Sequence, residues 1–315
     1  MKKVLVLVRL QGAKFPESVL YAISAGQKLG EVSILLAGNQ VEKALNEARF
    51  IKGIKKLWWI EDQKYEAGVA EDWQILVESL NEHYEVILTV ADSFAKSLLP
   101  RLAARFKNPF VANVVDIVDD NTFVHPIYTG SVLEILRVKS KEFILTVRPS
   151  AFNKATKDSQ QVIAKEVKVS KQQVLSDWQG KASGESAKDV ASAKTVVAGG
   201  RGLKTKENFH ALLQPLADVL HAAIGASRAV VEADFIGNEA QIGQTGKIIA
   251  PDLYIGVGIS GALQHISGIQ ESKVIVAINK DPEAPLFAIS DYILVADADE
   301  AIPRLTELIR EKNSR

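Results

Sequence analysis

Short apolar runs alternate with segments of helical spacing through the first part of the chain. Each run is rich in Val, Ile or Leu and has the length of a buried parallel strand. The strands are predicted at 2–10, 31–38, 55–62 and 84–92, and the helices at 17–30, 40–50, 71–83 and 93–106. This alternation predicts a doubly wound, mainly parallel sheet with helices on its faces.

The pattern changes after the fourth helix. Over residues 108–150 apolar and polar positions alternate, and no helical period is present. This alternation predicts strands and hairpins that form an antiparallel extension of the first sheet. Residues 164–170 add one more predicted strand. Small polar residues with Gly and Ser then fill Gln179 to Lys194, a composition typical of a linker.

Strand and helix patterns alternate again beyond the linker. The strands are predicted at 195–200, 252–258, 273–279 and 291–297, and the helices at 206–225, 260–269 and 299–312. The two alternating stretches predict an α/β fold with two domains, at 1–189 and 190–315. We expect each domain to be a Rossmann-like, mainly parallel sheet with flanking helices, and 315 residues suffice for two such cores.

The amino-acid composition excludes several classes of function. The chain has no Cys, which excludes disulfides, thiolate metal sites and cysteine nucleophiles. Lys plus Arg and Asp plus Glu both number 38, so net charge gives no reason to expect binding to nucleic acid or an anionic membrane. The five histidines show no metal-ligand spacing. Arg9 interrupts the N-terminal apolar run before a signal peptide is complete, and no stretch is suited to span a membrane, so we expect a cytoplasmic protein.

Glycine and small polar residues follow the strands of the second domain. They are Gly199 to Gly202, Gly258 to Gly261, Asn279 to Asp281, and Ala296 with Asp297. Carboxyl ends of parallel strands meet at one edge of a sheet, where the ligands of open α/β folds bind. A helix that begins at Ser260 or Gly261 would present free backbone N–H groups to an anion at this edge.

The residue types at this edge suit a nucleotide. Arg201 lies between two glycines, and its guanidinium is suited to anions. Glycine has no Cβ and lets a pyrophosphate approach the backbone. Asn279 and Asp297 offer hydrogen-bonding groups to a ribose or a base. These features together predict a nucleotide cofactor.

A competing interpretation is an NAD-binding dehydrogenase domain. Residues 256–261, GVGISG, fit the fingerprint G-x-G-x-x-G, and Asp281 lies about 20 residues further on, as that motif requires. However, the motif lies deep in its domain, whereas the fingerprint normally opens the first βαβ unit. It also leaves GGRG at 199–202 and GQTGK at 243–247 without a role.

Longer motifs in the same region resemble one family. They are GASRAVVEADF at 225–235, IGQTGKIIAPDLYIGVGISGALQHISGI at 242–269 and VIVAINKDPEAPLF at 274–287. These segments closely resemble the C-terminal domain of the electron transfer flavoprotein alpha subunit, with mild departures at the apolar positions Val257 and Leu263. VVDI, TFVHPIYTG and LTVRPSAF in the first half are also similar to the family, so the resemblance covers nearly the whole chain.

The resemblance implies an FAD-carrying electron carrier and not a substrate-transforming enzyme. In this family the alpha subunit pairs with a beta subunit, which holds an AMP. The heterodimer takes electrons from flavoprotein dehydrogenases, such as the acyl-CoA dehydrogenases of fatty acid β-oxidation. It passes them singly to a membrane quinone oxidoreductase or a similar acceptor. The first domain would then be a scaffold and docking surface for the beta subunit, and the second would hold FAD. A nucleotide-sensing module without redox function is a third interpretation.

The resemblance also implies roles for single residues. Ser227 and Arg228 match positions beside the isoalloxazine ring, where a guanidinium would stabilise the negative charge of the reduced flavin. Gln244 and Thr245 match the loop at the reactive edge of the ring, with the Thr245 hydroxyl facing N5. His265 matches a hydrogen-bond donor near the pyrimidine O2.

The remaining implied contacts are with the other parts of FAD. Backbone groups of Gly258 to Leu263 match the pyrophosphate site, and Asn279 and Asp297 match the adenosine end. The full set is Arg201, Ser227, Arg228, Ile242, Gly243, Gln244, Thr245, Gly258, Ile259, Ser260, Gly261, Ala262, Leu263, Gln264, His265, Asn279, Asp297 and Ala298.

Simpler structural roles compete with several of these assignments. Arg228 has Glu232 one helical turn away as an ion-pair partner. Thr245 lies between two glycines, as a turn residue would, and His265 could be a satisfied surface histidine. Asp297 precedes the last helix and is suited to cap it.

Overall fold

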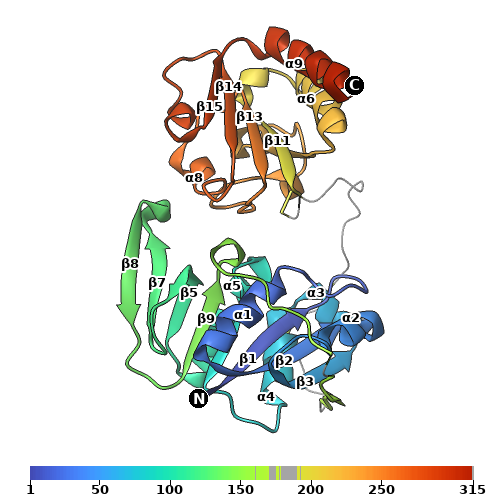
Figure 1. The fold of residues 1–315 in the computed structure, drawn as a ribbon, viewed down its shortest axis with the longest axis vertical. Helices are drawn as coiled ribbons and strands as arrows, with labels where there is room; N and C mark the ends of the chain where they lie inside the picture. Colours follow the sequence, from blue (N-terminus) through green and yellow to red (C-terminus); the bar gives the residue numbers. More distant parts are fainter. Residues whose placement is uncertain (160, 170–174, 177, 179–189, 192, 314–315) are drawn as a thin grey trace. The chain divides into compact units, whose positions relative to one another are not determined.

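The chain folds into two compact units, Met1–Lys181 and Ala182–Arg315 (Figure 1). A computed structural model describes residues 1–159, 161–169, 175–176, 178, 190–191 and 193–313. The boundary expected after residue 189 and most of the expected linker lie outside the described residues.

The first unit is built on a seven-stranded sheet in which every neighbouring pair is parallel. Its order is β10-β3-β2-β1-β4-β9-β5. The strands are β1 (Lys2–Arg9), β2 (Gly30–Gly38), β3 (Ile54–Glu61), β4 (Val86–Val90), β5 (Phe110–Val114), β9 (Phe143–Val147) and β10 (Ala164–Glu166). The central strands are apolar throughout because both faces of the sheet are covered. The predicted parallel sheet is confirmed.

Helices cover both faces of this sheet. They are α1 (Val19–Leu29), α2 (Val41–Ala48), α3 (Gln63–Ala67), α4 (Ala70–Glu78) and α5 (Ser93–Phe106). Successive residues of a strand point to opposite faces. Val4 and Val6 of β1 therefore pack with α1 and α2, whereas Leu5 and Leu7 pack with α3, α4 and α5. The sequence pattern did not predict α3, a short helix capped by the Asp62 carboxylate.

The expected antiparallel extension is confirmed as a three-stranded sheet of its own, whereas β5 and β9, which lie in the same stretch of 108–150, join the first sheet as parallel strands. Its strands are β6 (Asp116–Ile117), β7 (Thr122–Ile127) and β8 (Val132–Arg137). The chain passes from β5 into β6 after one residue, Val115, whose N–H donates to the Val124 carbonyl. On β8, Val132, Leu133 and Ile135 are exposed. This small sheet therefore presents apolar side chains to its surroundings.

The second unit is built on a five-stranded sheet in which all neighbouring strands are again parallel. In the order β12-β11-β13-β14-β15, the strands are β12 (Ala223–Ala226), β11 (Thr195–Gly199), β13 (Leu253–Val257), β14 (Ile275–Asn279) and β15 (Tyr292–Val295). The predicted helix at 206–225 was wrong at its end. His221 takes a left-handed conformation, with φ of 52°, which stops the helix and frees the next residues to form β12.

The helices of the second unit leave one edge of the sheet exposed. They are α6 (Lys206–Leu220), α7 (Arg228–Val231), α8 (Leu263–Ile266) and α9 (Ala298–Asn313). The long helices α6 and α9 pack on one face, and α8 with the 3-10 turn Pro285–Ile289 packs on the other (Figure 1). All four apolar residues of the edge strand β15 are exposed. Among the described residues, no helix has both the length and the apolarity needed to cross a bilayer.

The two large sheets differ at their carboxyl edges. In the first sheet the direction of winding reverses between β1 and β4, and Arg9 fills this position. The Arg9 Cζ lies 4.9 Å from the centroid of the Phe94 ring, and a Cβ on Gly68 would lie only 2.3 Å from Arg9 Nη1. In the second sheet the corresponding position, between β11 and β13, is bordered by Gly200 and Gly258. The second unit is therefore the one in which glycine backbone borders the position of reversal.

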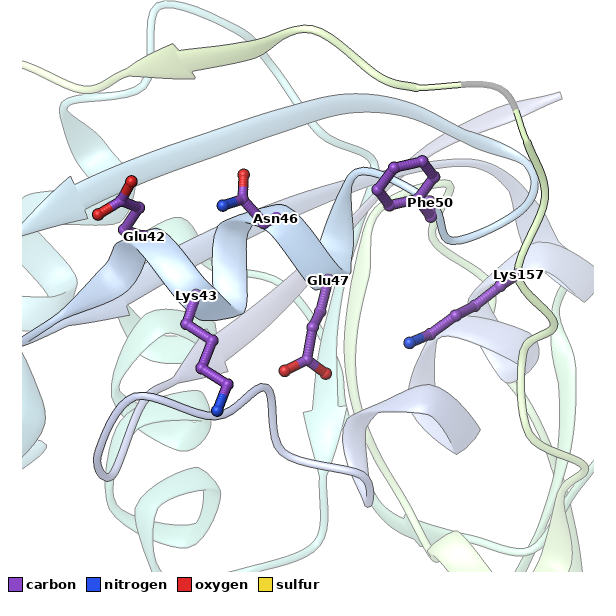
Figure 2. A pocket seen from close by; sticks show the side chains of 6 residues that line it. All are labelled: Glu42, Lys43, Asn46, Glu47, Phe50 and Lys157. Atoms are coloured by element: carbon purple, nitrogen blue, oxygen red, sulfur yellow. The ribbon is translucent and has the colours of Figure 1, made fainter.

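The first unit also holds a pocket of about 460 Å³ (Figure 2). It is lined by Glu42, Lys43, Asn46, Glu47, Phe50 and Lys157. Four of these side chains come from α2, and the lining mixes two carboxylates with two amines. The pocket shares no residue with the predicted cofactor site, and its mixed charges favour no one class of ligand.

Candidate functional site

The predicted site residues of the second unit converge on one edge of its sheet. All five strands are parallel, so their carboxyl ends lie on the same side. The chain runs from β11 to β12 and then crosses to β13 on the other side of β11. In open α/β sheets, the crevice at such a reversal is the place where ligands bind. The strand β12, which the sequence pattern missed, adds Ser227 and Arg228 to this edge.

Two glycine loops touch each other at the reversal. The N–H of Gly202 donates to the Gly258 carbonyl at 3.0 Å, and the N–H of Gly200 donates to Val257 at 2.9 Å. A Cβ on Gly200 would lie 2.3 Å from the Gly258 oxygen, and a Cβ on Gly258 would lie 2.9 Å from Gly202 Cα. Backbone therefore packs directly on backbone here. Arg201 lies between the two glycines and is exposed, in the 3-10 turn Arg201–Leu203.

The loop after β13 offers a row of backbone donors. The predicted helix start at Ser260 or Gly261 was wrong, because α8 begins at Leu263. Gly261 takes a left-handed conformation, with φ of 90°, and a Cβ there would lie 2.3 Å from the Leu286 nitrogen. Within the described part of the chain, the N–H groups of residues 259–264 make no hydrogen bond. These six N–H groups, and not the dipole of a four-residue helix, are the unbonded donors at this edge. Residues 260 and 262–264 are exposed, whereas Ile259 and Gly261 are buried.

The loop of residues 241–247 is fixed beside α8. Ile242 N–H donates to the Ala226 carbonyl of β12, and Gln244 N–H donates to the Gln264 carbonyl at 2.8 Å. Gly243 packs so closely that a Cβ there would lie 2.7 Å from the Gln264 oxygen. Because the loop is held through its backbone, the side chains of Gln244 and Thr245 remain exposed. The Thr245 hydroxyl accepts a hydrogen bond from Gln241, as a turn residue would.

Ser227 and Arg228 begin the short helix α7 directly after β12. Ser227 N–H donates to the Gly199 carbonyl, which ties this turn to the end of β11. The Arg228 side chain is exposed, and its Nε lies 2.7 Å from Glu232 Oε1. The simpler alternative, an ion pair one turn along the helix, is therefore present. Such an exposed pair is worth at most about 1 kcal/mol, so it leaves the guanidinium able to meet a second anion.

Asn279 is predicted to contact the adenosine end of FAD, and its side chain forms hydrogen bonds within the protein. Its Nδ2 donates to the Ile259 carbonyl at 2.9 Å, and its Oδ1 accepts from the Asp281 N–H at 3.1 Å. The side chain therefore joins the end of β14 to the donor loop after β13. Its position at the edge agrees with the prediction, and the geometry adds a role in shaping the loop.

Asp297 caps the last helix, as the simpler alternative proposed. Its Oδ1 accepts from the Asp299 N–H at 2.9 Å. Ala298, the first residue of α9, is buried. Lys204, which the sequence analysis did not single out, lies 2.7 Å from Asp299 and 3.7 Å from Asp297. Hydrogen bonds from Asn208 and Lys204 lower the pKa of Asp299, which stays ionised beside the cap.

His265 is buried, and both of its ring nitrogens are in hydrogen bonds. Nδ1 lies 3.1 Å from the Ile242 carbonyl oxygen, and Nε2 lies 2.7 Å from the Tyr254 hydroxyl. Burial lowers the pKa of His265 to about 4, although the hydrogen bond to Ile242 opposes this shift. The imidazole is therefore neutral at physiological pH. The surface alternative was wrong, and a donor role would require one of these two bonds to be given up.

Tyr254 is the residue of this site to which the sequence analysis gave no role. Its side chain is fully buried, and burial raises the pKa of its hydroxyl, which keeps its proton. A tyrosine in an otherwise aliphatic strand indicates a buried hydrogen bond, because a buried hydroxyl needs a partner. The sequence does not identify that partner.

The burial of His265 generates a prediction for its titration. The imidazole Hε1 resonance in a ¹H NMR titration should stay constant from pH 8 to about pH 5.5 and then titrate with a pKa of about 4. An unfolded chain takes up this proton near the ordinary pKa of 6.5. The side chain's contribution to stability is therefore complete above about pH 6.5 and is lost as the pH falls toward 4. Assignment by comparison with His265→Gln is the control, and a midpoint near 6.5 would contradict the buried, neutral state.

Comparison with known families covers both units. Residues 4–172 match the model described as the electron transfer flavoprotein domain. Residues 189–270 match the electron transfer flavoprotein FAD-binding domain. The second match contains the two glycine loops after β11 and β13, the donor row and His265.

Curated relatives match along almost their whole length. The electron transfer flavoprotein subunit alpha of Paracoccus denitrificans is 40% identical over 296 residues, which cover 94% of this chain and 96% of the relative. The subunit alpha of Pseudomonas aeruginosa is 36% identical over 308 residues, covering 97% and 99%. A mitochondrial subunit alpha of Cryptococcus neoformans is 37% identical over 314 residues, covering 97% and 91%. This chain belongs to the electron transfer flavoprotein alpha-subunit family.

Proposed function

We propose that this chain is the FAD-carrying subunit of a heterodimeric electron carrier. In this proposal it accepts electrons from flavoprotein dehydrogenases, such as acyl-CoA dehydrogenases. It passes them one at a time to a quinone oxidoreductase or a similar acceptor. The observation that carries the proposal is the row of six backbone donors at 259–264, next to the glycine contact between β11 and β13. This row lies inside the segment that matches the FAD-binding domain.

The residues of the second unit fit the pyrophosphate of FAD. A dinucleotide needs backbone N–H donors and freedom from side chains that would keep it away. Gly200, Gly202 and Gly258 allow the two loops to pack backbone on backbone, because a Cβ at any of them would collide with the facing loop, and this contact supports the loop that carries the N–H groups at 259–264. FAD, when bound, supplies the capacity to accept and release electrons, and the chain supplies its binding and its electrostatic surroundings.

Charge and position assign further roles at the ring end. The Arg228 guanidinium lies exposed after β12, where it would stabilise negative charge on a reduced ring. Gln244 and Thr245 project from a loop fixed by its backbone, so their polar groups keep a constant position. At the other end of the edge, Asn279 and Asp297 would border the adenosine. They would act mainly by holding the loops that surround it.

The first unit would serve as scaffold and docking surface for the beta subunit. The strand β8 carries exposed apolar side chains, which support this role. Leu133 is 62% exposed and Ile135 is 69% exposed. The beta subunit is expected to hold an AMP, and the first unit has Arg9 at the position where its own sheet would otherwise take a ligand. We also propose that the heterodimer works in the cytoplasm.

The geometry argues against the NAD alternative. Gly256, the first glycine of the apparent fingerprint, lies within β13 and not in the turn that follows it. A Cβ on Gly256 would lie 2.9 Å from Leu286 Cδ2 and 3.0 Å from the Tyr254 ring. This glycine therefore makes room for the core of the protein, whereas the fingerprint glycine makes room for a pyrophosphate.

The first test is the visible absorption spectrum of the chain co-purified with its beta subunit. We expect the spectrum of an oxidised flavin, which bleaches in steps on photoreduction and recovers in air. A colourless heterodimer that ignores added FAD but binds NADH would refute the proposal. FAD that is bound but not reducible would favour a nucleotide-sensing module.

Replacement of Arg228 tests its electrostatic role. Arg228→Ala should lower the flavin reduction potential by on the order of 20 mV and leave FAD bound. An exposed charge pair is worth up to about 1 kcal/mol, and for two electrons about 30 mV corresponds to about 1.4 kcal/mol. Spectroelectrochemical titration measures the potential. Arg304→Ala is the matched control, because Arg304 is equally exposed and pairs with Glu307 on α9. An unchanged potential in Arg228→Ala would show that this guanidinium does not act on the ring.

Replacement of Gly200 tests the contact between the glycine loops. Gly200→Ala places a Cβ 2.3 Å from the Gly258 oxygen, so the two loops must separate. We expect FAD affinity to fall at least tenfold, roughly the cost of losing one or two backbone hydrogen bonds to the ligand. Fluorescence titration of the flavin-stripped heterodimer measures the affinity. Gly12→Ala, in the first unit, adds a Cβ with nothing within 4 Å; its φ of 90° strains the substituted backbone locally, but the FAD affinity should remain unchanged. Equal FAD affinities for Gly200→Ala and wild type would show that this contact does not contribute to cofactor binding.

A further inference from the structure

The Tyr254 side chain reaches His265 through the core of the second unit. Tyr254 lies on β13 among aliphatic residues and is 0% exposed. Its hydroxyl lies 2.7 Å from His265 Nε2. Gly256, two residues further along the same face, allows this path, because a Cβ there would lie 3.0 Å from Tyr254 Cε1. The ring can therefore lean along the strand toward its carboxyl end.

The partners of His265 determine where its protons lie. The Ile242 carbonyl oxygen can only accept, so the facing Nδ1 carries a hydrogen. In the neutral imidazole, Nε2 is then the acceptor, and the Tyr254 hydroxyl donates to it. Each polar atom of this chain of hydrogen bonds has a partner, and the imidazole keeps no N–H for a third group.

The same hydrogen bonds join three parts of the site. His265 belongs to α8, at the end of the row of backbone donors. Its Nδ1 donates to the carbonyl oxygen of Ile242, in the loop that presents Gln244 and Thr245. Its Nε2 bonds to Tyr254 in the centre of the sheet. The buried imidazole thus adds a side-chain connection between the sheet and this loop to the backbone hydrogen bonds that hold the loop.

We propose that Tyr254 is a positioning residue for His265. Its hydroxyl fixes the plane and the hydrogen-bonding state of the imidazole, and the imidazole in turn holds the loop at 242–247 against α8. The importance of this arrangement for the cofactor rests on the proposed function. In this arrangement the neutral imidazole of His265 connects Tyr254 with Ile242.

The first test is ¹⁵N NMR of the full chain labelled at histidine. The chain has five histidines, and His265→Gln identifies the resonance of interest. We expect a protonated Nδ1 and an unprotonated Nε2 that accepts a hydrogen bond. In Tyr254→Phe the Nε2 resonance should move downfield to the position of a free acceptor, whereas the control Tyr292→Phe, on the exposed strand β15, should leave it in place. A protonated Nε2 in the wild type, or no shift in Tyr254→Phe, would overturn the proposal. If Tyr254→Phe does not fold, the protonation state of His265 Nε2 in the wild type still tests the proposal.

The second test asks whether Tyr254 acts through His265. The FAD dissociation constant of the flavin-stripped heterodimer should rise about tenfold in Tyr254→Phe, the equivalent of one buried hydrogen bond. In a His265→Gln background the same substitution should change it less than twofold, because the partner is already absent. Equal effects in both backgrounds would overturn the proposal. A heterodimer that binds no FAD but shows the expected ¹⁵N shifts would refute the proposed function and leave the role of Tyr254 intact.

Discussion

The contact between Gly200, Gly202 and Gly258 is the constraint on which the rest of the second unit depends. Two loops from adjacent parallel strands meet with no side chain between them, which is possible only because all three residues lack a Cβ. The contact brings the end of β11 against the start of the donor row. It therefore helps to place the N–H groups at 259–264, which make no hydrogen bond within the described residues. Under the proposed function, an anion would be bound here through close backbone packing and not through a concentration of positive charge.

Side chains around this contact mainly hold backbone in place. Asn279 fixes the Ile259 carbonyl, Asp297 caps α9, and His265 holds Ile242. Each of these polar groups makes hydrogen bonds within the protein, which fix the loops at this edge before any ligand arrives. In the proposed function, the groups that bind FAD would be largely backbone amides. The exposed groups Arg201, Arg228 and Thr245 complement them at the rim of the edge.

The fold and the place of the site could be predicted from the sequence because both follow from local patterns. Apolar runs mark buried strands, and parallel strands must end at a common edge. Details that depend on distant residues could not be predicted. Gly261 is left-handed because Leu286 packs against it, so α8 starts later than the helical spacing indicates. The pairing of Tyr254 with His265 needs a bend around the end of β13 that no periodicity reveals. By contrast, the ion pair of Arg228 is local to one helical turn and was foreseeable.

The bare edge of β15 has a consequence for the chain's behaviour at high concentration. A strand with four exposed apolar residues and an unpaired side is a template for pairing with the same strand of another copy. Asp291 and Asp297 flank it, and an antiparallel pair of copies would place these carboxylates near each other. Lys204 lies 3.7 Å from Asp297 and partly balances its charge, so these carboxylates give the edge only weak protection. The concentration of the subunit would then govern whether its copies stay apart.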